Sequence, residues 1–210
     1  MAIFAHEATA ALADSVRALI DSVRLADAPV DVLERARAAV ESARAGLDEY
    51  RHLGQVAQAS LDGADTGLRT SFTGTPNDYF PYSPIVGRRN PVAPPVEMWA
   101  DDGGRVHGRV TLQSAYNGPP GLVHGGVIAL VFDELLGACA IANECPGFTG
   151  TLTVKYIRGT PLRVPLTMES WLDRVEGRKT FVLGELRHGD EVTASAAGVF
   201  IATAHQITRQ

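Results

Sequence analysis

The sequence predicts an α+β protein in which one antiparallel sheet wraps around a long central helix, with a helical hairpin at the N-terminus. Three observations support this fold class. Residues 125–143 are apolar almost all round, which is typical of a helix enclosed on every side. Short segments that alternate polar and apolar residues lie on both sides of that run and predict strands. Residues 3–59 instead repeat apolar residues at helical spacing.

The first 60 residues are expected to form the helical hairpin. One face of its first helix carries Leu12, Val16, Leu19, Ile20 and Val23. A second helix can be capped by Asp31, with Glu34 three residues on, and is expected to fade near Ala59. The apolar stripe is narrow, so we expect the hairpin to pack on the main domain or on another subunit. It would serve there as packing support, or as a lid or a partner-specific interface.

A linker rich in proline and glycine, residues 61–94, is expected to join this hairpin (residues 1–60) to the main domain (residues 95–210). A structureless connection of this length is unusual unless it drapes over a surface or covers a site. Its aromatic residues Tyr79, Phe80 and Tyr82 are expected to anchor it, although they could also line an apolar channel.

Alternating patterns predict the strands of the main domain. They fall at 106–112 before the long helix, and at 151–156, 166–172, 180–186 and 192–201 after it. The sequences EGRK at 176–179 and HGDE at 188–191 are short turns that contain glycine, which is typical of hairpins. The four strands after the helix are therefore expected to form a meander.

Composition and charge exclude several classes of function. The formal net charge of the 210 residues is −5 without a dense basic cluster, which argues against a nucleic-acid face. Two cysteines do not make a disulfide framework, and no two His or Cys residues lie at metal-ligand spacing. The N-terminus lacks a signal-peptide pattern, and acidic residues interrupt the most apolar run. We expect a cytoplasmic protein without a membrane span.

Two adjacent acids, Asp133 and Glu134, lie within the apolar helix. Burying a carboxylate without partners costs several kcal/mol or raises its pKa. The two side chains point about 100° apart around the helix axis, so one can reach a cleft while the other pairs elsewhere. A carboxylate in an apolar cleft suits a general base or a nucleophile. The alternative is a salt bridge at a subunit interface, or a helix bent toward solvent, and helix geometry alone does not choose between the two acids.

A glycine turn opens the same helix. Gly125 and Gly126 lie at its N-terminus, where backbone N–H groups are unpaired and the helix dipole is positive. Without side chains these N–H groups can approach a carbonyl closely, which suits the stabilisation of an oxyanion. His124 either caps the turn or helps to bind the carbonyl.

The segment NGPPGLVHGGVIALVFDELLG followed by TGTLTVKYIRGTPL resembles the hotdog-fold acyl-CoA thioesterases of the phenylacetate-pathway and human THEM type. That family has an H-G-G turn that opens the central helix and an acid nine residues after the histidine, which here is Asp133. Its T-V-x-Y-x-x-x-T-P-L segment is matched by residues 153–162. The resemblance covers about residues 95–203. It implies a hotdog fold and hydrolysis of an acyl-CoA to the free acid and CoA.

The resemblance also implies roles for single residues. Asp133 would activate water or attack the thioester carbonyl, and the N–H of Gly126, with that of Gly125, would polarise it. Alignment on the strand tyrosine assigns Thr149, with Thr151 as a weaker candidate, to a position near the acid of the neighbouring subunit. Asn117 is the nearest match to an asparagine that the family places before the turn, and His124 is the histidine of the turn.

For the substrate, the resemblance implies that cations hold the CoA phosphates. The available cations are Lys155, Arg158, Arg178 and Lys179, and the turn at 178–179 is the preferred candidate. No separate cofactor is implied, because CoA is part of the substrate. Sites of this type span two subunits, so a homodimer is the minimum assembly and a dimer of dimers the larger alternative. The acyl group is left open.

Three alternatives remain beside this hypothesis. The first is a non-catalytic acyl-CoA-binding protein, a sensor or scaffold that uses the N-terminal hairpin as an interaction module. The second, an enoyl-CoA hydratase, requires a paired Asp and His on one segment, whereas His124 and Asp133 lie more than two helical turns apart. The third, Cys139 as a nucleophile, is disfavoured because a cysteine inside an apolar helix is by default a buried structural residue.

Overall fold

The computed structural model describes residues 2–54, 56–59, 75–94 and 96–202. Residues 61–74 of the predicted linker and residues 95 and 203–210 of the predicted main domain lie outside the described residues. The helices are α1 (Ala2–Leu25), α2 (Val30–Asp48), α3 (Pro76–Tyr79), the 3₁₀ helix η1 (Ser114–Tyr116) and α4 (Gly125–Ala142). The strands are β1 (Glu97–Ala100), β2 (Val106–Val110), β3 (Phe148–Tyr156), β4 (Leu166–Glu176), β5 (Lys179–His188) and β6 (Glu191–Ile201).

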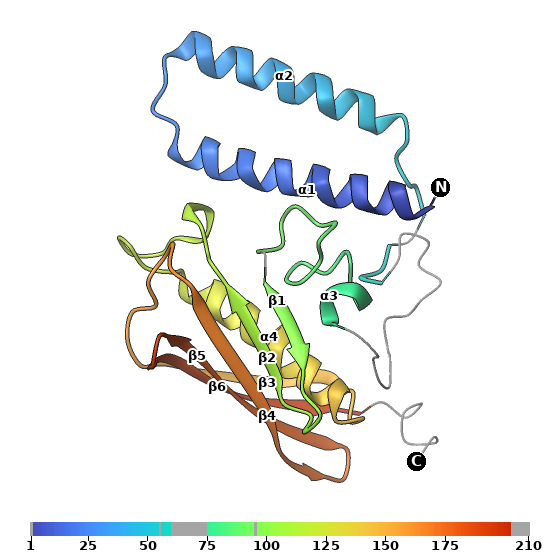
Figure 1. Ribbon diagram of the computed structural model, residues 1–210, viewed down its shortest axis with the longest axis vertical. Helices are drawn as coiled ribbons and strands as arrows, with labels where there is room; N and C mark the ends of the chain where they lie inside the picture. The colour runs from blue at the N-terminus through green and yellow to red at the C-terminus, as the bar shows by residue number, and fades with distance from the viewer. Residues whose placement is uncertain (1, 55, 60–74, 95, 203–210) are drawn as a thin grey trace.

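Six strands form one antiparallel sheet in the order β1-β2-β4-β5-β6-β3, and α4 lies against one of its faces (Figure 1). The helical hairpin lies on the far side of α4 from most of the sheet. This arrangement confirms the predicted α+β fold with a sheet around a central helix and an N-terminal helical region.

The enclosed helix α4 forms the centre of the core. Phe132, Leu135 and Leu136 are at most 1% exposed. Glycines on the facing strands allow the close approach, since a Cβ atom on Gly184 would lie 2.9 Å from Leu136 Cδ2. The helix is long and apolar enough to cross a membrane, but here the sheet supplies its apolar surroundings.

The predicted meander is correct for only three of its four strands. Strands β4, β5 and β6 are joined by the two predicted turns, whose glycines Gly177 and Gly189 have φ angles of +56° and +58°. Strand β3 instead pairs with β6 at the edge of the sheet, and β4 pairs with β2. The connection from β3 to β4 spans residues 157–165 and contains two prolines, so it is too long for a hairpin turn and carries the chain across the sheet.

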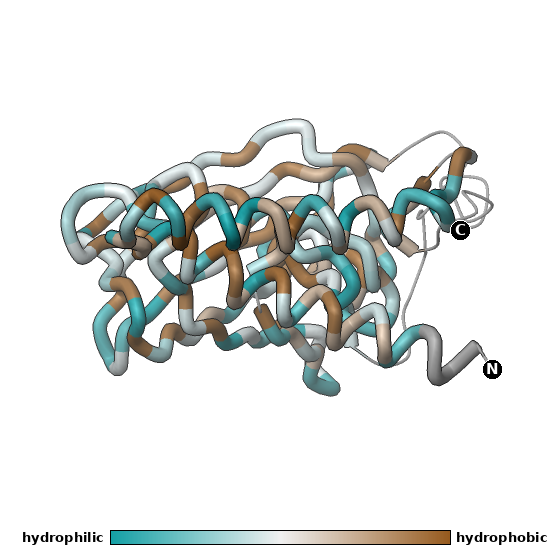
Figure 2. The backbone as a smooth tube through the Cα atoms, turned by 90° about the horizontal axis from the view of Figure 1, so that it is seen from above, coloured by the Kyte–Doolittle hydropathy of each residue, from teal (hydrophilic) through white to brown (hydrophobic). Residues whose placement is uncertain are grey.

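The first helix, α1, packs on the body through a polar face. Arg17 donates a hydrogen bond to the carbonyl of Asn90 at 2.8 Å, and neighbouring Ala13 is buried. The predicted apolar stripe points elsewhere: Leu19 is 38% exposed and Val23 67%. The hairpin therefore contacts the main domain, one of the two expected partners, but α1 does so through polar side chains and not through its apolar stripe. Figure 2 shows hydrophilic and hydrophobic residues alternating along both helices.

Helix α2 differs from its prediction at both ends. It begins at Val30 with Pro29 as the N-cap, and Asp31 pairs with Arg35 at 2.7 Å instead of capping. It ends at Asp48 and not near Ala59. Helix α2 has no buried residue, so tertiary packing does not stabilise further helical turns after Asp48.

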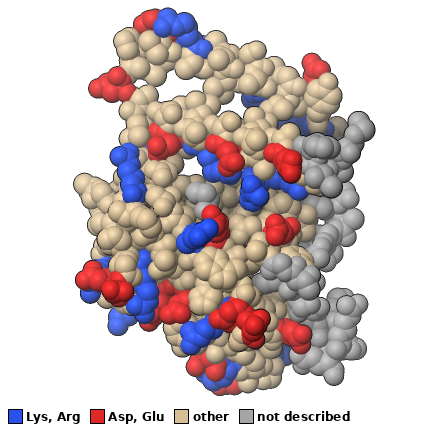
Figure 3. Space-filling view, viewed as in Figure 1, with Lys and Arg blue, Asp and Glu red and all other residues tan. Residues whose placement is uncertain are grey.

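The described part of the linker, residues 75–94, drapes over the core as expected. Phe80 is buried, and Asn77 ties the segment to β1 by accepting a hydrogen bond from the N–H of Met98 at 3.0 Å. Tyr82 is half-buried, with the guanidinium of Arg89 over its ring. Figure 3 shows positive and negative side chains interspersed over this face of the molecule.

The enclosure of α4 predicts the cost of a core truncation. Leu136→Ala should lower the free energy of unfolding by about 2–5 kcal/mol, since it removes a fully buried side chain and leaves a cavity. Leu130→Ala is the matched control on the same helix. It should lower the free energy of unfolding by less than half as much, because Leu130 is 45% exposed. Chemical denaturation monitored by fluorescence measures both, and equal losses would contradict this account of the core.

Candidate active site

The two adjacent acids of α4 face different surroundings, as their angular separation predicts. Asp133 points toward β3, where the Thr149 hydroxyl donates a hydrogen bond to its Oδ1 at 2.8 Å. Glu134 points toward the draped segment 75–94, where the Ser83 hydroxyl donates to its Oε1 at 3.1 Å. One acid therefore lies beside an edge strand and the other under a loop.

A β-bulge places Thr149 next to Asp133. The register of β3 against β6 shifts between Thr149 and Thr151, so Thr149 pairs with the buried Phe200 on the side of the sheet that faces α4. Without the bulge, strict alternation with the inward-facing Leu152 would turn Thr149 away from α4. The hydroxyl reaches the acid of its own chain.

The histidine of the H-G-G turn acts as the N-cap of α4. The N–H of Gly126 donates to His124 Nδ1 at 3.0 Å, so this predicted oxyanion donor already has an acceptor. A Cβ atom on Gly126 would lie 3.1 Å from the same nitrogen. The N–H of Gly125 has no acceptor among the described residues, and it is the amide that this turn leaves open to a ligand.

A tight loop brings Asn117 to the H-G-G turn, although Asn117 lies seven positions before His124. Asn117 and Val123 form an antiparallel bridge, and the N–H of His124 donates to the carbonyl of Tyr116 at 2.9 Å. The Asn117 side chain donates to the carbonyl of Gly118 at 2.8 Å. Asn117, His124, Gly125 and Gly126 thus form one group, which we call the amide half-site.

Tyr156 belongs to the same group, although the sequence analysis used it only to align the strand. Its hydroxyl donates to the carbonyl of Gly125 at 2.8 Å. A Cβ atom on Gly125 would lie 3.4 Å from the Tyr156 ring, so the glycine allows the strand to come close to the helix. The tyrosine of the T-V-x-Y segment was the signal that could have identified this contact.

Asp133 and Thr149 form a second group, which we call the acid half-site. Asp133 lies eight positions after Gly125 in α4. At 1.5 Å per residue they lie about 12 Å apart along the helix axis. That distance is too great for the acid and the amide of one chain to act on the same carbonyl group.

Glu134 has the environment of a structural acid. Its half-buried side chain meets Ser83, which is fully buried and also accepts the N–H groups of Ile85 and Val86 at 3.0 and 3.3 Å. Burial, together with the neighbouring charge of Asp133, raises the pKa of Glu134 to about 7, and the Ser83 hydrogen bond opposes part of this shift. Glu134 therefore anchors the draped segment.

The four predicted phosphate-binding cations are dispersed. Lys155 alternates with Val154 and Tyr156 and so faces the outer side of the sheet, away from α4. Arg158 pairs with Glu191 at 2.6 Å just beyond the amide half-site. Lys179 lies two strands from Phe148, at the end of the sheet that carries the acid half-site, and Arg178 donates to the carbonyl of Ala202. The structure thus brings Arg158 and the turn at 178–179 to opposite ends of β3, and Lys155 to neither half-site.

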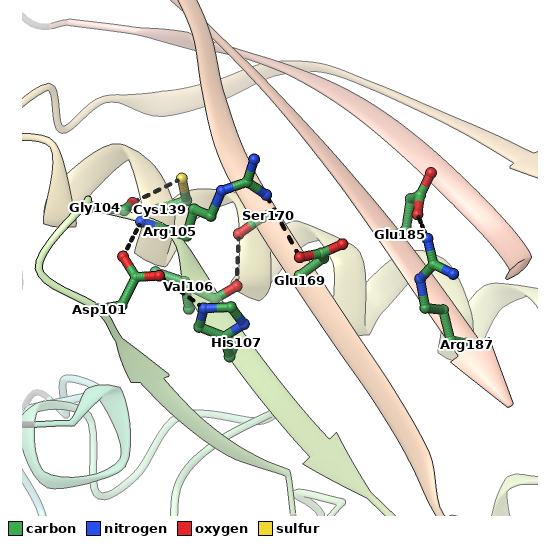
Figure 4. Close-up of polar contacts among 10 residues, drawn as sticks. All are labelled: Asp101, Gly104, Arg105, Val106, His107, Cys139, Glu169, Ser170, Glu185 and Arg187. Carbon is green, nitrogen blue, oxygen red and sulfur yellow. Dashed lines mark hydrogen bonds and ion pairs between the residues drawn. The ribbon is translucent and has the colours of Figure 1, made fainter. Parts of the chain in front are cut away.

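Cys139 lacks the properties of a nucleophile. It is fully buried in α4, and its thiol points at the carbonyl of Gly104 with an Sγ–O distance of 3.6 Å (Figure 4). Burial raises the pKa of this thiol to about 11, so the reactive thiolate is disfavoured.

The only His–Asp pair close enough for a salt bridge within the described residues, His107 and Asp101 at 2.9 Å, stabilises the β1–β2 turn (Figure 4). Asp101 also accepts hydrogen bonds from backbone N–H groups of the same turn. In the part of the chain that the structure describes, no cluster of three His, Cys, Asp or Glu side chains could hold a metal ion.

Comparison with known proteins identifies similar chains. The family model of the thioesterase superfamily matches residues 120–195. A solved structure described as a thioesterase superfamily protein is 32% identical, with a TM-score of 0.79, and the match covers 92% of this chain and 94% of that one.

Two curated relatives match part of the chain. The acyl-coenzyme A thioesterase THEM4 of Mus musculus is 40% identical over 86 residues, which are 40% of this chain and 37% of that protein. The acyl-coenzyme A thioesterase THEM5 of Homo sapiens is 30% identical over 90 residues, which are 42% of this chain and 36% of that protein. The chain thus spans little more than a third of the length of these relatives.

The environment of Glu134 predicts a pH-dependent stability. The carboxyl group has an ordinary pKa of 4.5, and burial raises the pKa to about 7 in the folded protein. Between these values the folded state retains a proton that the unfolded chain releases, so the free energy of unfolding should fall as the pH rises through this window. Glu134→Gln should remove this component, because glutamine carries no titrating proton.

Denaturation at about pH 5 and about pH 8 measures this slope. Glu34→Gln, which alters an exposed carboxyl on α2, is the control and should leave the slope as in the wild type. A Glu134→Gln protein with the same pH dependence as the wild type would contradict the assignment.

Proposed function

We propose that this chain, which belongs to the thioesterase superfamily, hydrolyses the thioester of an acyl-CoA to the free acid and CoA. The observation that carries the proposal is the acid half-site. Asp133 is partly exposed on an otherwise apolar helix, and Thr149 holds one of its carboxylate oxygens at 2.8 Å. The similarity of part of the chain to acyl-CoA thioesterases supports this choice of substrate.

The acid half-site supports a role for Asp133 as general base. Thr149 donates to Oδ1, and Oδ2 has no partner among the described residues, so Oδ2 can accept a proton from water. The water oxygen then attacks the thioester carbon, the C–S bond breaks, and the proton on Asp133 passes to the departing CoA sulfur. Direct attack by the carboxylate is the alternative, in which water hydrolyses the resulting anhydride.

The amide half-site supports stabilisation of the oxyanion. The N–H of Gly125 lies at the positive end of α4 and can donate to the thioester oxygen as charge develops on it. The N–H of Gly126 can join only if His124 releases it. His124 and Asn117 shape the turn that presents these amides.

We propose a homodimer as the functional unit, because the two half-sites of one chain lie about 12 Å apart. Strand β3 contacts α4 at both half-sites, since Tyr156 bonds Gly125 and Thr149 bonds Asp133. β3 is also an edge strand, with one side paired to β6. Antiparallel pairing of its other side with β3 of a second copy would bring the amide half-site of each chain next to the acid half-site of the other.

Binding of the CoA phosphates is assigned to the cations at the ends of β3. Arg158 lies beyond the amide half-site, and Arg178 and Lys179 lie at the end that holds the acid. A non-catalytic acyl-CoA-binding protein would use the same half-sites and cations without requiring Asp133. Release of free CoA from acyl-CoA therefore distinguishes the two functions.

Asp133→Asn should lower the hydrolysis of acyl-CoA on the order of 100-fold or more, because it removes the base and keeps the shape of the side chain. Glu134→Gln is the matched control on the neighbouring residue and should keep most of the activity, since Glu134 faces the draped segment. A panel of acyl-CoAs with a thiol-reactive dye measures both. Equal activity of Asp133→Asn and the wild type would refute the role of Asp133.

Mixing two inactive variants tests whether the site is shared between chains. Asp133→Asn lacks the acid, and Gly126→Val should disrupt the amide half-site, because a Cβ atom there meets the His124 ring. Co-expression should recover part of the activity, since a mixed dimer contains one site with an intact acid and an intact turn. If the mixture is as inactive as each variant alone, each site is built from a single chain.

A further inference from the structure

The N-terminal helix α1 contacts the loop that builds the amide half-site. Three charged residues of α1, Arg17, Asp21 and Arg24, recur at helical spacing on the face that meets the body. Arg17 bonds the carbonyl of Asn90, while Asp21 and Arg24 bond the segment around η1. This segment immediately precedes the loop that carries the H-G-G turn.

Asp21 and Arg24 hold opposite ends of η1. The N–H of Ser114, the first residue of η1, donates to Asp21 Oδ1 at 2.9 Å. Arg24 Nη2 donates to the side-chain oxygen of Asn117, the C-cap of η1, at 2.7 Å. On the other side of η1, Arg163 of the main domain donates from its Nε to Ser114 Oγ at 3.0 Å. The turn is thus fixed between α1 and the main domain.

The contact with Arg24 determines the orientation of the Asn117 carboxamide. A guanidinium has only donors, so the oxygen of the carboxamide must face Arg24. The amino group is then turned toward the loop, where it donates to the carbonyl of Gly118 at 2.8 Å. The backbone next to Asn117 holds the H-G-G turn, since the carbonyl of Tyr116 accepts from the N–H of His124.

We propose that Asp21 and Arg24 are positioning residues of the thioesterase site, which makes α1 part of the catalytic apparatus. This inference rests on the proposed function. Arg24 acts through Asn117 and Asp21 through η1. Both keep the loop at residues 116–124 in the geometry that presents the Gly125 amide to the thioester.

Paired substitutions test this role with steady-state kinetics on the full chain and an acyl-CoA of the panel. Arg24→Ala should lower kcat about 10-fold and change KM less, because a displaced catalytic group costs rate. Arg24→Lys should recover part of kcat, since it keeps a charged donor. Asp21→Ala should behave like Arg24→Ala, whereas Asp21→Asn keeps an acceptor for the N–H of Ser114 and should retain most of the activity.

Arg35→Ala is the matched control. Arg35 lies in the same hairpin, on the exposed face of α2, and pairs only with Asp31 among the described residues. Its kcat should equal that of the wild type. Hydrogen exchange supplies a second readout: amides of residues 114–126 should exchange faster in Arg24→Ala and Asp21→Ala than in Arg35→Ala, with core strands unchanged.

The outcomes separate the two levels of inference. An active wild type with Arg24→Ala and Asp21→Ala equal to Arg35→Ala would overturn the positioning role and leave the proposed function intact. A loss of kcat accompanied by faster exchange throughout the sheet would also overturn it, because the residues would then act on global stability. A wild type that releases no CoA from any acyl-CoA would overturn the proposed function, and the positioning role with it.

Discussion

The packing of the apolar helix α4 into the concave face of the sheet is the interaction on which the rest of the structure depends. It forms the centre of the buried apolar cluster, and it sets the two points at which function can occur. At the N-terminus of α4 the backbone amides emerge beside Tyr156. Two turns further, Asp133 emerges beside Thr149. A buried helix can present polar groups only where the enclosure opens, and both openings lie along β3.

Strand β3 therefore has three roles that are physically linked. Its inner face touches both half-sites, its bulge turns Thr149 toward the acid, and its free edge is the surface through which a second copy can pair. Because the half-sites of one chain are too far apart to share a substrate carbonyl, assembly and catalysis would depend on the same strand. Such a strand cannot shift its register without separating the acid from its hydroxyl partner.

The two adjacent acids show how environment separates residues of similar chemistry. Asp133 keeps access to solvent and one charge-stabilising hydroxyl, which suits proton transfer. Glu134 lies against the buried Ser83, and its raised pKa reflects the cost of charge under the draped segment. The same contrast appears in α1, whose charged face docks on the body while its apolar stripe remains exposed. That exposed stripe, with the unburied α2, leaves apolar side chains of the hairpin exposed.

The sequence by itself determined the enclosed helix, the two glycine hairpins, the helical N-terminal region and, apart from Tyr156, the candidate residues of both half-sites. These features depend on local periodicity, on turn chemistry and on a motif of fixed spacing. Tertiary structure alone decided that β3 pairs with β6 and that a bulge turns Thr149 inward. It also decided which of two acids is held by a hydroxyl near the strand edge, and that α1 meets the body through Arg17, Asp21 and Arg24. The reason is that each of these outcomes is a competition among partners distant in the chain, and local patterns carry no information about which partner is nearest in space.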